Sequence, residues 1–267
     1  KWYRLAAEQG LAKAQNSLGS MYKNGEGVTE NGQEAVKWYR LAAEQGDVDA
    51  HYNLGWMYAN GEGVIQDYSE SVKWFRLAAK QGSDRAQLSL GSMYDDGIGV
   101  AENYREAVKW YRLAAEQGLA VAQQKLGVMY DYGKGVAEDD REAVKWYRLA
   151  AEQGHNISQY VLGMYYDNGI GVTEDDRESV KWYRLAADQG FAAAQFELGA
   201  MYANGKGVSK DRMKAVNWWR LAAEQGYAQA QFNLGSVYLR GEDADQNKEK
   251  AVKLFRLASE QGFAEAQ

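Results

Sequence analysis

Residues 50–64 read AHYNLGWMYANGEGV, and residues 72–79 read VKWFRLAA. Both phrases return every 36 residues without an insertion, and a Leu-Gly pair recurs in step with them. The tryptophan of the second phrase stands at Trp2, Trp38, Trp74, Trp110, Trp146, Trp182 and Trp218. A strict period of this length is typical of a solenoid, in which each repeat contacts only its neighbours. We therefore expect one array of about seven and a half units over residues 1–267.

The period divides the chain into whole and partial units. The whole repeats are 11–46, 47–82, 83–118, 119–154, 155–190, 191–226 and 227–262, and the partial units are 1–10 and 263–267. Since both ends fall inside a unit, we interpret the chain as a piece of a longer array.

The first whole repeat predicts a pair of helices. Ala14, Leu18 and Tyr22 are spaced as one apolar helix face, which predicts a helix over 12–24 that ends at Gly25. A second helix is expected over 33–45, with Asn31 as its N-cap, because Asn and Asp side chains accept from the free amides of a first turn. The same slot holds Asp67, Asn103, Asp139, Asp175, Asp211 and Asn247. The predicted fold is an all-α solenoid of αα-hairpins.

Composition narrows the class of function. Hydrophobic residues make up 46% of the chain, which is enough for a continuous core, and the net charge of −6 argues against a nucleic-acid partner. No apolar run is long enough to predict a membrane span. The absence of cysteine excludes disulfides and thiolate chemistry, and it leaves the compartment open, bacterial cytoplasm and periplasm included.

The Leu-Gly pair, the tyrosine after it, Gly-x-Gly-Val and Ala-x-x-Trp-Tyr fall in one register over essentially the whole chain. In this pattern the chain resembles the Sel-1-like repeat (SLR) family, a branch of the tetratricopeptide-like solenoids. The resemblance implies a right-handed superhelix and a non-catalytic scaffold or adaptor for other proteins, typical of bacteria, with no cofactor. The last repeat departs from the pattern in two places: it has Gly241-Glu242-Asp243-Ala244 instead of Gly-x-Gly-Val, and Leu254 in the tryptophan slot. These departures indicate that the array is near its C-terminal end.

A partner is expected on the concave surface, which the first helix of each repeat lines in tetratricopeptide-type arrays. The positions that point away from the Leu18 face vary between repeats, whereas the slots that build the solenoid do not. An extended or helical peptide with apolar anchors and some basic residues would suit this surface. The residues predicted to bind it are Tyr52, Trp56, Leu88, Asp95, Gln124, Asp131, Tyr160, Met164, Asp167, Phe196 and Phe232.

Two interpretations of the aromatic residues stay open. An aromatic at the slot of Tyr52 either meets a partner or packs against the neighbouring repeat. Trp56 is one of only two tryptophans outside the repeated slot, and it replaces small residues, so we expect it to be the binding hot spot.

Other motifs have a simpler interpretation. Gly-x-Gly-Val lacks the strand and the Lys-Ser/Thr of a phosphate loop and predicts a turn. The arginine column at Arg40 and its equivalents is expected to be solvated or to form ion pairs with the acidic column at Glu44. The acidic run 174–176 lacks the spacing of a calcium loop, so no metal site is predicted. His51 and His155 have no cysteine partner and form no serine triad, so no catalytic site is predicted.

Alternatives to a scaffold remain. The array could assemble head to tail through its ends, and a few SLR proteins are linked to β-lactam binding or hydrolysis. The near-identity of the repeats is compatible with consensus design or with recent natural duplication, and scattered variation such as Ile98, Tyr132 and Asn156 favours duplication.

Overall fold

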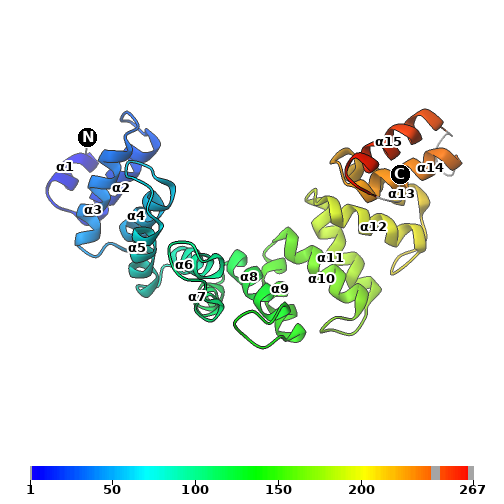
Figure 1. Cartoon of the computed structure of the whole chain (residues 1–267), viewed down its shortest axis with the longest axis horizontal. Coiled ribbons are helices and arrows are strands. Elements are labelled where there is room, and N and C mark those ends of the chain that lie inside the picture. Colours follow the sequence, from blue (N-terminus) through cyan, green and yellow to red (C-terminus); the bar gives the residue numbers. More distant parts are fainter. Residues whose placement is uncertain (1, 242–246, 264–267) are drawn as a thin grey trace. The chain divides into compact units, whose positions relative to one another are not determined.

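The computed structural model describes residues 2–241 and 247–263 (Figure 1). Within these ranges the chain forms 15 α-helices and no strand. The chain divides into two compact units, Lys1–Glu138 and Asp139–Gln267. The irregular phrase after Gly241 and the partial unit after Phe263 lie outside the described residues.

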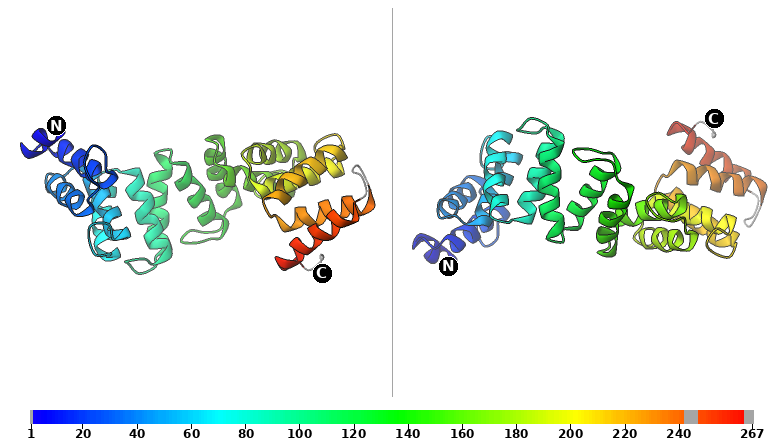
Figure 2. Two further views of the ribbon diagram at one scale, coloured as in Figure 1. Left: turned by 90° about the horizontal axis from the view of Figure 1, so that it is seen from above. Right: turned by 90° about the horizontal axis from the view of Figure 1, so that it is seen from below.

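The first unit contains eight helices. Their bounds are α1 Trp2–Glu8, α2 Ala12–Asn24, α3 Gly32–Glu44, α4 Val48–Asn60, α5 Tyr68–Lys80, α6 Asp84–Asp96, α7 Tyr104–Glu116 and α8 Ala120–Asp131. Three helix pairs, α2–α3, α4–α5 and α6–α7, follow one another along the chain, and the second helix of each pair also packs on the next first helix (Figure 2).

The second unit contains seven helices with the same pairing. Their bounds are α9 Asp140–Glu152, α10 Asn156–Asn168, α11 Asp176–Asp188, α12 Ala192–Asn204, α13 Arg212–Glu224, α14 Ala228–Arg240 and α15 Lys248–Glu260. The pairs are α10–α11, α12–α13 and α14–α15, and α9 packs on α10. The protein is therefore an all-α repeat solenoid, as its period predicts.

Local signals set the helix ends. Helix α2 has the predicted bounds, and α3 begins one residue earlier than predicted, at Gly32. The side chain of Asn31 accepts hydrogen bonds from the backbone amides of Gln33 and Glu34, which confirms the predicted cap. Asn or Asp caps the other six second helices in the same way, at α5, α7, α9, α11, α13 and α15.

Glycine lets the two helices of a pair approach closely. A Cβ at Gly19 would lie 2.7 Å from the ring of Tyr39, which is 1% exposed between the helices. Leu18, the preceding residue, is also buried, and full burial of such a side chain contributes roughly 1.5–3 kcal/mol. The Leu-Gly pair therefore places one core residue and one close contact side by side.

A second glycine brings successive repeats together. Gly63, in the turn after α4, has φ +70° and touches the first residue of α3, where an added Cβ would lie 2.1 Å from the carbonyl of Gly32. The turn interpretation of Gly-x-Gly-Val is thus confirmed, and the same glycine also supplies a contact between repeats.

Two polar ladders join neighbouring repeats. In the first, the amide of Gln45 donates to Gln15 Oε1 at 2.7 Å, and Gln15 donates to the carbonyl of Ala7 at 3.1 Å. Gln15 is buried, so the pairing of its amide avoids the cost of an unsatisfied polar group.

The second ladder corrects the expectation for the arginine column. Arg76 donates to the hydroxyl of Tyr94 at 2.7 Å, and Arg112 donates to Tyr130 at the same distance. Arg4, Arg40, Arg148 and Arg184 make the equivalent bond. For these six arginines the predicted pairing with the acidic column is therefore wrong, because their guanidinium groups reach the tyrosine of the next first helix instead.

Candidate functional site

The first helices present one face away from the core of each pair, which we call the first-helix face. In the first whole repeat it consists of Lys13, Asn16, Ser20 and Lys23, and later repeats supply the equivalent positions. Every described residue at these positions is half-buried or exposed, whereas Ala14, Leu18 and their equivalents are buried. The predicted binding residues thus lie on the accessible side of their helices.

The aromatic residues of this face also pack against the next helices. Tyr52 lies 5.5 Å from the ring of Phe75, and Tyr160 lies 5.3 Å from Phe191. Phe196 and Phe232 make similar contacts, at 5.4 Å from Tyr227 and 5.5 Å from Phe255. Because all four predicted residues remain half-buried, each ring supports the fold with one side and keeps another accessible.

Trp56, the expected hot spot, is paired within the chain. It packs against the core clusters of two neighbouring repeats, and Lys23 Nζ lies 3.4 Å from the centre of its ring. A cation over an indole contributes roughly 0.5–1 kcal/mol at an exposed site. A ligand that covered this face of Trp56 would have to displace Lys23.

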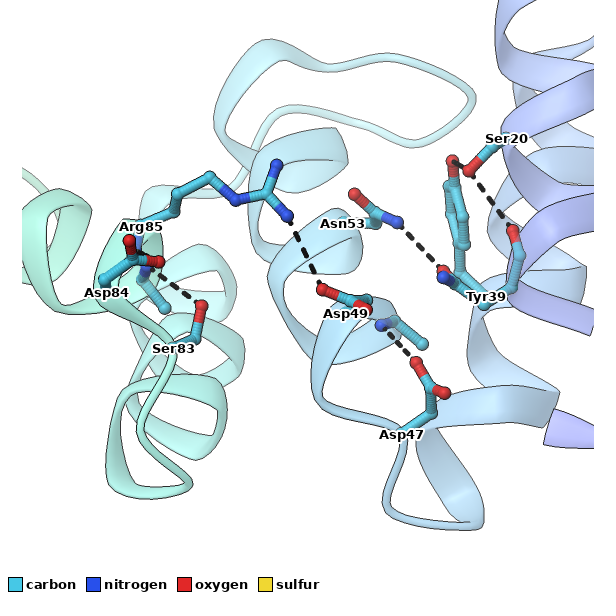
Figure 3. A network of polar contacts seen from close by, with 11 residues as sticks. Ser20, Tyr39, Asp47, Asp49, Asn53, Ser83, Asp84 and Arg85 are labelled. Atoms are coloured by element: carbon cyan, nitrogen blue, oxygen red, sulfur yellow. Dashed lines mark hydrogen bonds and ion pairs between the residues drawn. The ribbon is translucent and has the colours of Figure 1, made fainter. Parts of the chain in front are cut away.

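A polar network links helices α2, α4 and α6 of the first unit (Figure 3). Arg85 reaches back from α6, so that its Nη2 lies 3.5 Å from Asp49 Oδ1 on α4 and its guanidinium 4.7 Å from the ring centre of Tyr52. Asn53 donates to Asn16 Oδ1 at 2.9 Å. These contacts hold α2, α4 and α6 in register along the first-helix face.

Two predicted acidic residues, Asp167 and Asp95, accept hydrogen bonds from other parts of the chain. Asp167 accepts from Lys206 Nζ at 2.8 Å, and Asp95 accepts from the hydroxyl of Tyr111 at 3.2 Å. Asp131 is half-buried at the end of α8. Basic residues of a partner would therefore have to compete with Lys206 for Asp167.

The three remaining predicted residues are also placed on this face. Leu88 on α6, Gln124 on α8 and Met164 on α10 are half-buried, and Met164 packs against a core cluster of the second unit.

Glu197 is a charged residue of this region that the sequence analysis missed. It lies on α12, and burial raises the pKa of its carboxyl, with repulsion from Asp167 as a second cause. Its charge also raises the pKa of Tyr160 and Tyr227, after the larger effect of their own burial. Its slot holds Asn53, Ser89 and Asn233 in other repeats. An acidic side chain at this slot in one repeat alone could therefore have been noticed in the sequence.

Both histidines have structural roles. His51 takes the place of the ladder glutamine, and burial lowers its pKa. His155 caps α10 by accepting from the amide of Ser158, and burial lowers its pKa too. The hydroxyl of Ser158 lies 3.0 Å from the same ring but is fully buried, so this contact offers no accessible nucleophile.

The acidic run 174–176 at the start of α11 is contacted by a lysine of the next repeat. Asp175 caps the helix, and Lys206 Nζ lies 3.2 Å from Asp176 and 3.8 Å from Glu174. Asp176 also raises the pKa of Lys206, after the larger effect of the hydrogen bond to Asp167. Over residues 2–241 and 247–263, no group of three or more His, Asp or Glu side chains is placed to hold a metal ion.

The stacked helix pairs and the face of variable residues define a repeat protein of the solenoid class. Eight matches to the Sel1 repeat cover residues 1–11, 12–47, 48–83, 84–119, 120–155, 156–191, 192–227 and 228–263. The chain belongs to the Sel1 repeat family. Repeat proteins of this fold are generally protein-interaction scaffolds and are typically non-catalytic.

Two solved structures are similar over almost the whole chain. One is a protective antigen of uropathogenic Escherichia coli strains that displays an SLR fold, at 42% identity and a TM-score of 0.96. The match covers 99% of this chain but only 57% of that one, so the chain spans little more than half the length of this relative. The other is a Sel1 repeat protein from Oxalobacter formigenes, at 38% identity and a TM-score of 0.80, covering 99% of this chain and 76% of that one.

No curated protein matches the chain in sequence. Among the helices that the structure describes, none is both long and apolar enough to cross a membrane.

Proposed function

We propose that the protein is a non-catalytic scaffold that binds a peptide or protein segment along its first-helix face. One observation supports this most directly: the face is built from the slots that differ between repeats. The slot of Trp56 holds Ser20, Ser92, Val128 and Met164 in other repeats, whereas the adjacent Leu-Gly slots do not change. Slots that only support the fold are expected to repeat, and slots that recognise a partner are free to differ.

The chemistry of the face supports peptide binding. Half-exposed aromatic side chains such as Tyr160 and Phe196 provide apolar anchors at low entropic cost. Glu197 adds negative charge beside Tyr160, which favours a ligand with a basic residue near an apolar one.

A capture experiment from a bacterial lysate tests the proposal. The immobilised chain is compared with a Trp56→Ser/Tyr160→Gln double variant, whose new residues stand in the same slots of other repeats, at Ser20 and Gln124. We expect a protein that binds the parent chain to be lost with the double variant. Thermal unfolding of both proteins checks that the variant is folded.

The matched control is Leu77→Gln, which removes an exposed apolar side chain from the second helix α5. Retained capture by this control assigns binding to the first-helix face. Equal capture by parent and double variant would contradict the proposal, and loss with Leu77→Gln alone would place binding on the second helices.

A further inference from the structure

In the first unit, an arginine of the chain itself lies over a tyrosine of the first-helix face. The guanidinium of Arg85, on α6, lies 4.7 Å from the ring centre of Tyr52, on α4. Its Nη2 also lies 3.5 Å from Asp49 Oδ1 (Figure 3). The contact therefore combines a cation over an aromatic ring with an ion pair to a nearby carboxylate. It shows what kind of group the tyrosine slot of this face can accept.

The second unit keeps the tyrosine and lacks the arginine. Tyr160, on α10, holds the same slot, and its ring packs against Tyr183 and Phe191 but stays half-buried. The slot of Arg85 is held by Ala193, on α12. Among the residues that the structure describes, no lysine or arginine lies over the ring of Tyr160. The arginine that covers the ring in the first unit thus has no counterpart here.

Glu197 brings a carboxylate to this tyrosine. It lies one turn after Ala193 on α12, and its charge raises the pKa of Tyr160 and of Tyr227, after the larger effect of their burial. The equivalent slot on α6 holds Ser89, on the helix that supplies the arginine of the first unit. The second unit has therefore exchanged an arginine for alanine and, one turn away, a serine for an acid.

The carboxylate of Glu197 has no cation of its own. Within the part of the chain that the structure describes, no hydrogen bond or ion pair reaches it, and none reaches the hydroxyls of Tyr160 and Tyr227. Asp167, which also raises the pKa of Glu197, is by contrast bound by Lys206 at 2.8 Å. A half-buried acid without a donor is destabilised, and a cation rich in donors relieves this cost.

We infer that Glu197 and Tyr160 together bind the guanidinium group of an arginine in the peptide ligand. The guanidinium lies over the ring of Tyr160, as Arg85 lies over its own tyrosine, and donates to the carboxylate of Glu197. Arginine suits this site better than lysine, because its flat, weakly hydrated group can stack on a ring and donate to a carboxylate at the same time. The inference rests on the proposed function and adds the residue type that this site selects.

Nuclear magnetic resonance titration of the full, ¹⁵N-labelled chain tests the inference. The probes are the capped peptide Gly-Phe-Arg-Phe-Gly and its counterparts with lysine or with citrulline, the neutral relative of arginine, each at millimolar concentration. We expect the arginine peptide to shift the backbone amide signals of Tyr160 and Glu197. The citrulline peptide should bind at least about tenfold more weakly, and the lysine peptide roughly threefold more weakly.

Two variants locate the site. Glu197→Gln removes the charge at nearly constant shape and should weaken binding of the arginine peptide by about tenfold or more. Ala193→Arg supplies the residue found at Arg85, and it should weaken binding to a similar extent because the chain's own guanidinium then occupies the site. The control is Glu224→Gln, which removes the same charge from the exposed end of α13 and should leave the affinity within about twofold of the parent.

Several outcomes overturn the inference: no shift with the arginine peptide, equal binding of the citrulline peptide, binding of the lysine peptide as tight as that of arginine, or an unchanged affinity in either variant. An equal loss in Glu224→Gln would also overturn it, because net charge alone would then explain the effect.

The proposed function can fail separately. If capture depends on Trp56 and Tyr160 but the citrulline peptide binds as well as the arginine peptide, only the inference is wrong. If the arginine preference holds but the parent and the Trp56→Ser/Tyr160→Gln variant capture proteins equally, only the proposed function is wrong.

Discussion

Gln81 and His51 form a hydrogen bond of 3.1 Å between the amide nitrogen and Nδ1 of the ring. The amide nitrogen can only donate, so Nδ1 must accept, and the bond of the ring to the backbone of Ala43 is left to Nε2–H. His51 also stacks on Trp74, with the ring centres 5.8 Å apart. A neutral histidine thus replaces the glutamine of the ladder in both of its hydrogen bonds.

This arrangement predicts that acid destabilises the protein through its histidines. Burial lowers the pKa of His51 and of His155 below the ordinary value of 6.5. The unfolded chain therefore binds more protons than the folded chain just below pH 6.5, and the free energy of unfolding falls as the pH drops through this window. Above pH 6.5 this contribution is fully present.

Urea unfolding at pH 8 and pH 5 measures this effect. His51→Gln restores the ladder residue, so we expect stability within about 0.5 kcal/mol of the parent at pH 8 and higher stability than the parent at pH 5. His155→Ser, which supplies the cap found at Ser83, should show the same pH trend. An unchanged gap between pH 8 and pH 5 in His51→Gln would contradict the assignment.

The contact between Gly63 and Gly32 predicts that the second glycine of the turn cannot be replaced. In Gly63→Ala the new Cβ overlaps the carbonyl of Gly32, in addition to the cost of its left-handed backbone. Gly25→Ala is the matched control, since Gly25 has φ +71° but no heavy atom closer than 3.6 Å to the added Cβ.

We expect Gly25→Ala to lower the free energy of unfolding by roughly 1–2 kcal/mol, and Gly63→Ala to lower it by a further 1–3 kcal/mol. Denaturant titration of both variants is the measurement. Equal losses would show that backbone conformation alone requires the glycine.

Local features of the fold were predictable from the sequence. Asn31 at the N-cap and Gly25 at the C-cap act within one turn, so a single repeat is enough to place the helix ends. The period itself predicts the stacking of pairs. The general position of the first-helix face follows from the apolar spacing that includes Leu18. This spacing marks the buried side of the helix, so the side chains on the opposite side form the accessible face.

Contacts between repeats were not predictable in the same way. Arg76 and Tyr94 are 18 residues apart, and only the offset between stacked pairs brings them together. The same holds for Lys23 over Trp56 and for Lys206 beside Asp167, which join residues of neighbouring repeats. Such pairs depend on the geometry of stacking, which a periodic sequence does not specify.

The bond between Arg76 and Tyr94 predicts a measurable coupling between repeats. Arg76→Met and Tyr94→Phe should each lower the free energy of unfolding by about 1 kcal/mol, and the double variant should lose less than the sum. A double-mutant cycle measures the difference. Arg220 and Tyr238 serve as the control cycle, because Arg220 donates to Asn217 instead of the tyrosine, and we expect additive losses there. Additive losses at Arg76 and Tyr94 would show that the hydrogen bond between them does not stabilise the fold.

Lys206 predicts a pH-dependent and salt-dependent link from α10 and α11 to the turn after α12. Its hydrogen bond to Asp167 raises its pKa above the ordinary value of 10.5, so its contribution is present at neutral pH and is lost as the pH rises through the raised pKa. Since Lys206 is partly exposed, we expect Lys206→Met to lower the free energy of unfolding at pH 7 by about 1 kcal/mol at most, and by less at high salt.

Lys134→Met is the matched control, because Lys134 holds the same slot but lies over the ring of Tyr104. Hydrogen exchange of the turn amides should accelerate in Lys206→Met and not at the equivalent turn of Lys134→Met, and equal behaviour of the two variants would show that the carboxylates around Lys206 do not stabilise the fold.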